Sequence, residues 1–442
     1  MNCPICGHTT RPGAKFCGKC GQALPSTPAV RRMPKARLGN NLLLIIGAGL
    51  IFYLLGALGV TVLSKATGTA VSATPTPAPI TLAVTPREAG QKGLDWLLNS
   101  AVGWQRKQKC FGCHVQSFAI MGAAVARANV YEIDTAKIKE LADYLASIQA
   151  AQGLITSGDG TFRPVVQTVL AGIGLSQYDQ HVGTEYGSTL VKMADWLVTQ
   201  QTGAGYWRID HEEAPVDQGN AMATGAALMT LAAAKRHHAQ STYDRAIQRG
   251  ATWLRTVRPS TTQDVVFAII GLKAGGVADD DPDVARFIEL LNNQQNADGG
   301  WGETTRLDSN GYATGQALYA YKIAGVSIHD ESFRQGVFWL LEHQQSNGSW
   351  QQINSQQRKS DRSSNFATTM WAAIGLGEIF SPEVEAEFIG TLIHPTGSRL
   401  GLGGLATFLL IPVLVVLPVW WRRQGRRWLA FRREQRMGGQ QQ

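Results

Sequence analysis

The chain has 442 residues and a formal net charge of +8, and this length suits one large domain with additional segments. The basic residues gather at the ends, since residues 1–40 hold seven Lys or Arg and no acid, and residues 422–442 hold seven Arg and one Glu. The rest of the chain is therefore net acidic, which argues against a nucleic-acid-binding surface on the main domain.

Residues 1–24 contain two Cys-x-x-Cys pairs, each followed by Gly, with ten residues between the pairs. Four thiolates at this spacing are able to bind one Zn²⁺ in tetrahedral geometry, and the glycine after each pair permits a tight turn beneath the metal. The segment resembles the short zinc ribbons at the start of many prokaryotic membrane proteins. We therefore expect a zinc ribbon in which Cys3, Cys6, Cys17 and Cys20 bind the zinc ion. The alternative is a disulfide pair.

Two uncharged apolar segments, residues 41–63 and 400–421, are each long enough to cross a bilayer. The basic linker 25–40 precedes the first segment, and the basic tail 422–442 follows the second. Because basic flanks favour the cytosolic side, we expect a cell-membrane protein with both termini in the cytosol and its main domain outside the cytoplasm. The alternative for the second segment is a buried core helix.

The expected extracytoplasmic part begins with a linker rich in Thr, Pro and Ala, residues 64–86. The sequence KCFGCH follows at residues 109–114. Cys-x-x-Cys-His is the attachment signature of c-type haem, in which two thiols add to the vinyl groups and the histidine binds iron. We therefore predict a covalent haem at Cys110, Cys113 and His114. The predicted compartment fits, because c-type haem is attached outside the cytoplasmic membrane.

Two other readings of this motif remain open. One is a disulfide between Cys110 and Cys113, which would be stable outside the cell and would leave His114 without a role. The other is a zinc site with His181 or His211 as a further ligand. If haem is bound, its second axial ligand is undetermined, and the candidates are Met121, Met222, His181 and His211. An empty second axial position is the other alternative, and it would favour ligand or substrate chemistry over simple electron transfer.

Two kinds of helical segment alternate along residues 87–395. One set of segments has an amphipathic pattern with a large residue at a constant depth, and its members begin at Gly93, Leu141, Met193, Gly250, Arg286 and Gly336. A second set between them is apolar nearly all round and rich in Gly and Ala, and it occupies residues 117–128, 165–176, 222–234, 264–275, 312–325 and 366–380. Six helix pairs that bury one of the two sets predict an all-α fold, an α6/α6 toroid.

The connectors carry a recurrent pattern of Gln, a Gly-rich turn and an aromatic residue, at residues 200–207, 294–303 and 344–351. We expect the Gly to allow a sharp turn, the Gln to cap a neighbouring helix and the aromatic ring to pack over it. QGVFWLLEHQQSNGSW (335–350) resembles the QW motif of squalene–hopene cyclases and related terpenoid cyclase/prenyltransferase toroids. The resemblance implies the toroid fold, and Cys-x-x-Cys-His is similar to haem-binding inserts of some bacterial cyclase-like toroids.

The catalytic acid that the resemblance implies is missing, because the sequence has no Asp-x-Asp-Asp motif. The acidic run 279–283 precedes an amphipathic helix, and we interpret it as helix capping. Four polar residues are candidates for a cavity mouth, although a solvated capping loop is the preferred interpretation: His211, Glu212, Asp217 and Asp264. Four aromatic residues either line an apolar pocket or belong to the core: Tyr312, Tyr319, Phe366 and Trp371.

The sequence thus predicts a membrane-anchored, extracytoplasmic toroid with a covalent haem and an electron-transfer or redox role. An apolar or isoprenoid ligand in the barrel and a redox partner protein are part of this expectation, and nucleic acid is not. One alternative is a haem-free cyclase- or prenyltransferase-like enzyme. The other is a non-catalytic binding or scaffold protein with a Cys110–Cys113 disulfide.

Overall fold

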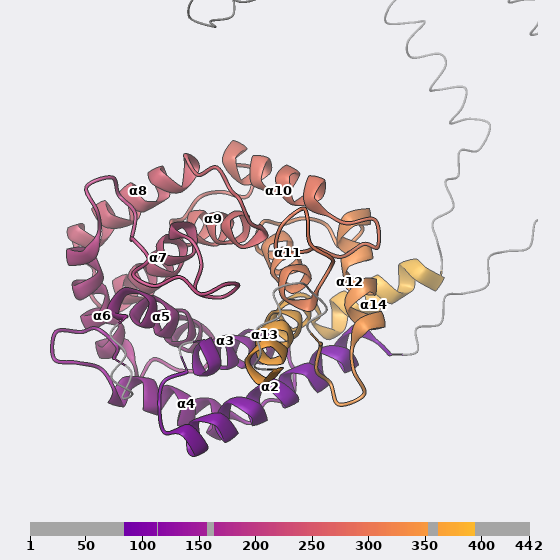
Figure 1. The fold of residues 1–442 in the computed structure, drawn as a ribbon, viewed down its shortest axis with the longest axis horizontal. Helices are drawn as coiled ribbons and strands as arrows, with labels where there is room; N and C mark the ends of the chain where they lie inside the picture. Colours follow the sequence, from indigo (N-terminus) through magenta and orange to yellow (C-terminus); the bar gives the residue numbers. More distant parts are fainter. Residues whose placement is uncertain (1–83, 113, 157–162, 352–360, 394–442) are drawn as a thin grey trace, which may run out of the picture. The chain divides into compact units, whose positions relative to one another are not determined.

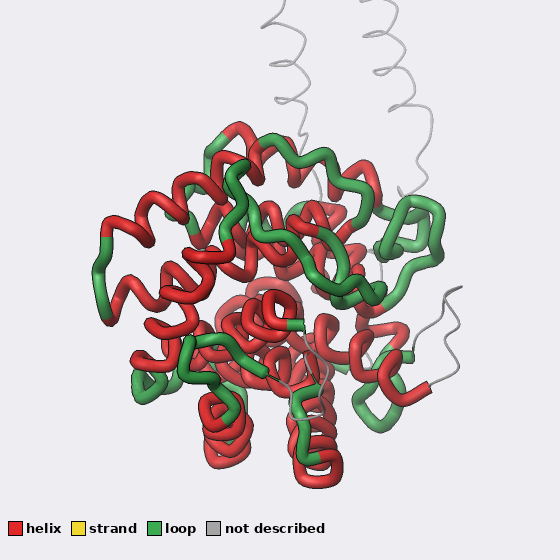
Figure 2. The backbone as a smooth tube through the Cα atoms, turned by 60° about the vertical axis from the view of Figure 1, so that its left-hand side comes forward, coloured by secondary structure: helices red, strands yellow, loops and turns green. Residues whose placement is uncertain are grey.

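A computed structural model describes residues 84–112, 114–156, 163–351 and 361–393, and every regular element within these ranges is a helix (Figure 2). The predicted zinc ribbon, both predicted membrane spans and Cys113 lie outside the described residues. Among the helices that are described, none combines the length and apolar character needed to cross a bilayer.

Six inner helices form a closed ring (Figure 1). Each contacts the next one in the ring, and the last contacts the first. They are α3 (His114–Ala128), α5 (Pro164–His181), α7 (Asn220–His237), α9 (Thr262–Ala274), α11 (Gly311–Ile323) and α13 (Asp361–Ile379). These helices coincide with the Gly- and Ala-rich segments, so the prediction of an inner set is confirmed.

Six outer helices surround this ring and alternate with the inner helices along the chain (Figure 1). They are α2 (Pro86–Gln108), α4 (Thr135–Ser147), α6 (Gly187–Gln200), α8 (Ser241–Arg255), α10 (Pro282–Gln294) and α12 (Glu331–His343). The expected α6/α6 toroid is therefore present in the described residues. An additional helix that the repeat pattern did not predict, α14 (Pro382–Ile393), contacts α2.

Burial explains why the two sets differ in composition. Helix α8 buries Tyr243, Ala246, Gly250 and Leu254, which lie on one face at helical spacing, and its charged residues Asp244, Arg245 and Arg249 are exposed. The inner helices are covered by neighbours on nearly all sides, and small residues let their backbones approach closely. A Cβ atom at Gly315 of α11 would lie 2.2 Å from backbone atoms of α13.

The Gln–Gly–aromatic connectors join neighbouring outer helices. Gln295 donates from Nε2 to the carbonyl oxygens of Gly299 (2.7 Å) and of Ser332 on α12 (2.9 Å). Gly299 has a φ of +87°, which glycine adopts without strain. The buried Trp301 donates from Nε1 to the carbonyl of Leu291 at 2.8 Å. The glutamine thus bonds to the first turn of the following outer helix, and the tryptophan closes the helix that precedes the turn.

The same contacts recur around the ring. Gln201 bonds to α8, Gln344 bonds to α2, and Trp207 and Trp350 repeat the indole contact. A fourth glutamine, Gln149, bonds to Gly153 and to the carbonyl of Thr189 on α6. This connector lacks the sequence pattern of the other three, because no Trp or Tyr follows its glycine.

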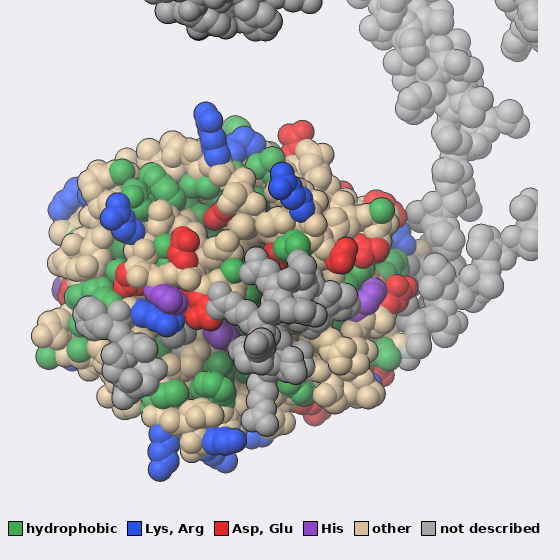
Figure 3. All heavy atoms as spheres, in the orientation of Figure 1, with side chains coloured by type: hydrophobic (Ala, Val, Ile, Leu, Met, Phe, Trp, Pro, Cys, Tyr) green, Lys and Arg blue, Asp and Glu red, His purple; other side chains and the backbone are tan. Residues whose placement is uncertain are grey.

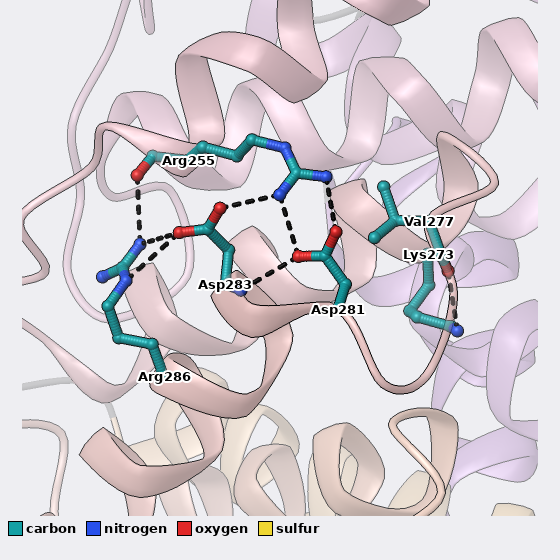
Figure 4. Close-up of polar contacts among 6 residues, drawn as sticks. All are labelled: Arg255, Lys273, Val277, Asp281, Asp283 and Arg286. Carbon is teal, nitrogen blue, oxygen red and sulfur yellow. Dashed lines mark hydrogen bonds and ion pairs between the residues drawn. The ribbon is translucent and has the colours of Figure 1, made fainter.

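The acidic run before α10 is structural, as predicted (Figure 4). Asp281 is the N-cap of α10, and its carboxylate accepts two hydrogen bonds of 2.8 Å from the guanidinium of Arg255. Asp283 pairs with Arg255 (2.7 Å) and with Arg286 (3.1 Å). Lys273 donates to the carbonyl of Val277 at 2.9 Å and pairs with Asp279. These carboxylates hold α8, α9 and α10 together.

Candidate functional site

The inner helices run parallel, so their N-termini meet at one mouth of the ring and their C-termini at the other. The hydrogen bond from the Arg127 guanidinium in the last turn of α3 to the carbonyl of His181 at the end of α5 (2.6 Å) reflects this direction. We call the two ends the N-terminal mouth and the C-terminal mouth. The connectors from outer to inner helices, with the Cys-x-x-Cys-His segment among them, reach the N-terminal mouth.

Residues 109–112, which we call the link, lie between the end of α2 and Cys113, and α3 begins at His114. The buried side chain of Gln116 holds the link from inside, since Oε1 accepts from the backbone N–H of Gly112 (3.1 Å) and Nε2 donates to the carbonyl of Cys110 (3.0 Å). Cys110 itself is partly exposed. The link is therefore held in place by a side chain of the helix that it leads into.

His114 is the first residue of α3, and its ring lies 5.9 Å from that of Phe366. Its Nε2 atom is buried and has no hydrogen-bond partner in the described part of the chain. Burial lowers the imidazole pKa to about 4, and Glu213 opposes this shift. The imidazole is therefore neutral at physiological pH, and a neutral imidazole with an orphaned buried nitrogen fits the residue required as an iron ligand of haem c.

The other proposed ligands divide between the two mouths. His181 ends α5 at the C-terminal mouth, so it lies at the opposite end of the ring from His114 and does not join it in one site. His211 is nearer, because its Nε2 lies 3.6 Å from a carboxylate oxygen of Glu213, the acid that also acts on His114. Met121 and Met222 are buried core residues on α3 and α7. The described residues contain no group of three or more His, Cys, Asp or Glu suited to a metal ion.

The connector between α6 and α7 extends over the middle of the ring at the N-terminal mouth (Figure 1). Two inner-helix side chains hold it there. Gln263 of α9 donates from Nε2 to the carbonyls of Val216 (3.0 Å) and Gln218 (2.9 Å). The hydroxyl of Tyr312 on α11 lies 2.5 Å from Gln263 Oε1 and 3.3 Å from the carbonyl of Pro215. Tyr312 therefore fixes this connector and is not an apolar pocket residue.

Asp217 in this connector is buried, with 6% of its surface exposed. Its backbone pairs with that of Glu213 through two hydrogen bonds of 2.8 and 2.9 Å, and its Oδ1 atom is buried without a partner in the described structure. Burial raises the pKa of Asp217 to about 7, against the opposing effect of Arg163. The interpretation of Asp217 as a solvated capping acid is therefore wrong, because the connector folds inward over the ring.

The two remaining acidic candidates are not part of an enclosed site. Asp264 forms a capping box with Thr261 at the start of α9, as the capping interpretation predicts. Glu212 is exposed on the connector. On the face seen in Figure 1, histidine, basic and acidic side chains lie side by side near the middle of the ring (Figure 3). Arg163 and His211 both lie within 4.0 Å of the Glu213 carboxylate, so this group brings opposite charges together.

An aromatic cluster fills the ring below this mouth. The fully buried Trp371 of α13 packs against Phe118 of α3, Phe267 of α9 and Tyr319 of α11, with ring centroids 5.1, 6.0 and 5.7 Å away. Helices α3 and α9 lie on opposite sides of the ring, so the cluster spans the interior. Trp371 is core, and Tyr319 belongs both to this cluster and to a cavity of about 360 Å³ at the C-terminal mouth.

Comparison with known proteins places part of this fold in a family context. The family profile described as squalene-hopene cyclase C-terminal domain matches residues 261–357, which include α9 to α12. No curated protein matches the sequence. The profile match and the ring of helix pairs together indicate a terpenoid-cyclase-like toroid.

Three solved structures resemble the described fold at low sequence identity. A variant of the type II terpene cyclase MstE from Scytonema, in complex with geranylgeranyl dihydroxybenzoate, is 16% identical over 65% of this chain and 97% of its own, with a TM-score of 0.43. A protein from Actinoplanes is 15% identical over 68% and 99%, with a TM-score of 0.45. A glycosidase variant is 11% identical over 69% and 98%, with a TM-score of 0.44.

Proposed function

We propose that this protein is a membrane-anchored, extracytoplasmic toroid that carries a covalent c-type haem at Cys110, Cys113 and His114 and acts in electron transfer or redox chemistry. The observation that supports it most is the buried Nε2 atom of His114, which has no partner among the described residues and directly follows the two-cysteine segment. When bound, such a haem would supply one-electron chemistry.

The chain's own residues would prepare this site in two ways. Gln116 holds the backbone of the link at Cys110 and Gly112, which limits the positions that the thiols can take. Burial keeps the imidazole of His114 unprotonated, so no proton competes for Nε2 at neutral pH. A redox partner protein would approach the N-terminal mouth, and an apolar or isoprenoid ligand in the ring remains part of the proposal.

The remaining parts of the proposal depend on sequence patterns alone. Residues 41–63 and 400–421 would anchor the toroid in the cell membrane with both termini in the cytosol. A zinc ion would be bound in the cytosol by Cys3, Cys6, Cys17 and Cys20.

An absorption spectrum tests the haem proposal. The full chain is produced in a host that matures c-type cytochromes, together with Cys110→Ala, Cys113→Ala and, as a matched control, Cys17→Ala in the predicted ribbon. We expect a reduced α-band that survives denaturation in the parent and in the control. The band should shift or disappear in the variants at 110 and 113. A colourless parent whose thiols react only after reduction would show a disulfide and would favour the scaffold alternative.

A second candidate function follows from Asp217. Its buried carboxyl group, with a pKa of about 7, suits a general acid or base near neutral pH. The same raised pKa makes it a weak acid, which disfavours the alkene protonation that the cyclase resemblance implies. Asp217→Asn distinguishes the two functions, because it should leave a haem spectrum intact and abolish turnover in a haem-free enzyme.

A further inference from the structure

The cavity at the C-terminal mouth is built from the ends of inner helices and is separate from the Cys-x-x-Cys-His segment. Its volume is about 360 Å³, and its walls come from α5, α7, α9, α11 and α13. At about 30 Å³ per water molecule, this volume equals roughly a dozen waters and suits a ligand of roughly ten non-hydrogen atoms.

The cavity lining combines apolar side chains with polar ones, and it includes a buried hydroxyl that the described residues leave unsatisfied. Met229, Ile270 and Ile323 are among the apolar lining residues. Ser176 is 3% exposed, and its hydroxyl has no hydrogen-bond partner in the described structure. An unsatisfied buried hydroxyl costs the folded protein about 1–3 kcal/mol. A ligand that forms a hydrogen bond with this hydroxyl removes the cost, which favours binding.

Glu378, near the end of α13, carries the one lining charge that the described residues leave without an ion pair. Its carboxylate accepts no hydrogen bond from any described residue. Burial raises the pKa of Glu378 to about 7, and Lys322 of α11 opposes the shift without forming an ion pair. Glu378 also raises the pKa of Tyr319 beyond the effect of burial, which indicates that the phenol and the carboxylate are neighbours.

The cationic groups at the cavity are already neutralised. Arg236 of α7 binds Asp179 at 2.7 Å, and Lys273 of α9 pairs with Asp279. Burial and Arg236 lower the pKa of His181, so this imidazole is neutral at physiological pH. The C-terminal ends of the parallel inner helices add partial negative charge at this mouth. With these cations paired, Glu378 is the charged lining group that remains to pair with a bound cation.

We propose that this cavity binds an organic cation, namely an amine with a small apolar body. Its ammonium group would bind the carboxylate of Glu378 and lie beside Tyr319 and Ser176, and its apolar part would lie against Met229, Ile270 and Ile323. This site is independent of the haem proposal, since it uses the other mouth of the ring.

Calorimetric titration of the purified full chain tests this with three probes of similar size. They are 2-phenylethylamine as the cation, 2-phenylethanol as the neutral probe and 3-phenylpropanoate as the anion. We expect the amine to bind at least tenfold more tightly than either of the others at pH 8, where Glu378 is ionised and the amine is still charged.

Variants assign the effect to the cavity. Glu378→Gln keeps the side-chain shape and should lower the amine affinity at least tenfold. Tyr319→Phe, the second variant, should lower it about threefold. Glu342→Gln on the exposed surface of α12 is the matched control and should bind like the parent. Equal binding of amine and alcohol, preference for the carboxylate, no binding, or an unchanged affinity in Glu378→Gln would each overturn the proposal.

Discussion

Gln344, the C-cap residue of α12, donates a hydrogen bond of 2.8 Å to the carbonyl oxygen of Ala89 on α2, 255 residues earlier in the chain. The same amide donates to the carbonyl of Gly348 at 3.1 Å. This contact joins the last outer helix to the first, at the position where Gln201 and Gln295 join consecutive outer helices. One connector motif therefore both builds the repeat and closes the ring.

Loss of this contact should weaken the closed ring. Gln344→Ala leaves two carbonyl groups without their donor, so we expect the free energy of unfolding to fall by about 1–2 kcal/mol. Urea unfolding followed by circular dichroism measures the change. The adjacent exposed residue provides the control, since Gln345→Ala should alter stability by less than about 0.5 kcal/mol. Equal effects of the two substitutions would contradict a closing role for Gln344.

Close packing of α11 against α13 depends on Gly315. Gly315→Ala would place a methyl group 2.2 Å from the backbone of Trp371, so the two helices must separate. We expect a loss of about 3 kcal/mol or more, because overpacking strains the core on both sides. Thermal unfolding checks this.

The matched control for Gly315 lies in the middle of α2, where a Cβ atom at Gly103 has nothing within 4 Å. Gly103→Ala should stabilise the protein by up to about 1 kcal/mol, since alanine favours the helix. A destabilised Gly103→Ala variant, or a neutral Gly315→Ala variant, would contradict the packing described for the inner helices.

The buried carboxyl of Asp217 should make stability depend on pH. Its folded pKa of about 7 exceeds the unfolded value of about 3.9, so the folded state retains a proton that the unfolded state loses. Stability should therefore fall as the pH rises from about 4 to about 7 and then level off. The upper limit of this contribution is roughly 4 kcal/mol.

Asp217→Asn removes this titration, so its stability relative to the parent should increase with pH across the same range. Urea unfolding at pH 4.5, 6 and 8 measures the difference, in which other titrating groups cancel. Gln345→Ala, on an exposed residue without a titratable group, should show no such trend. A parent-to-variant difference that is constant with pH would argue against the buried position of Asp217.

The guanidinium of Arg255 joins two carboxylates, so its shape matters as well as its charge (Figure 4). Arg255→Lys keeps the charge and loses the bidentate contact with Asp281, and we expect a loss of about 1 kcal/mol, because the pair is partly exposed. Arg245→Lys on the exposed face of α8 should have no measurable effect. Thermal unfolding at low and high salt measures the stability of both variants. An equal change in stability for Arg255→Lys and Arg245→Lys would show that only the charge of Arg255 matters.

A substitution at Gln116 tests whether its hydrogen bonds to the link are needed for haem attachment. Gln116→Leu removes both hydrogen bonds to the link, so we expect the haem content per protein to fall severalfold in a host that matures c-type cytochromes. Gln248→Leu, at an exposed position on α8, should retain the haem content of the parent. Full haem content in Gln116→Leu would show that the link needs no support from α3.

Local patterns determined the elements of this fold. Helical period and the contrast between amphipathic and Gly/Ala-rich segments identified six helix pairs, because burial on one side or on all sides selects different residues. The acids before α10 were also readable, since helix capping depends on neighbours in sequence. The repeat did not predict α14, because that helix lies outside it.

The tertiary structure alone decided which residues share a site. Asp217 is buried because Gln263 and Tyr312, 46 and 95 residues further along, hold its connector over the ring. His114 and His181 lie at opposite mouths because parallel helices place their first and last residues at different ends. Glu378 meets Tyr319 only because the ring brings α11 and α13 together. The local sequence pattern predicts which face of a helix is buried. The hydrogen-bond partners and pKa values of individual side chains depend on contacts between distant helices, which form only when the ring closes.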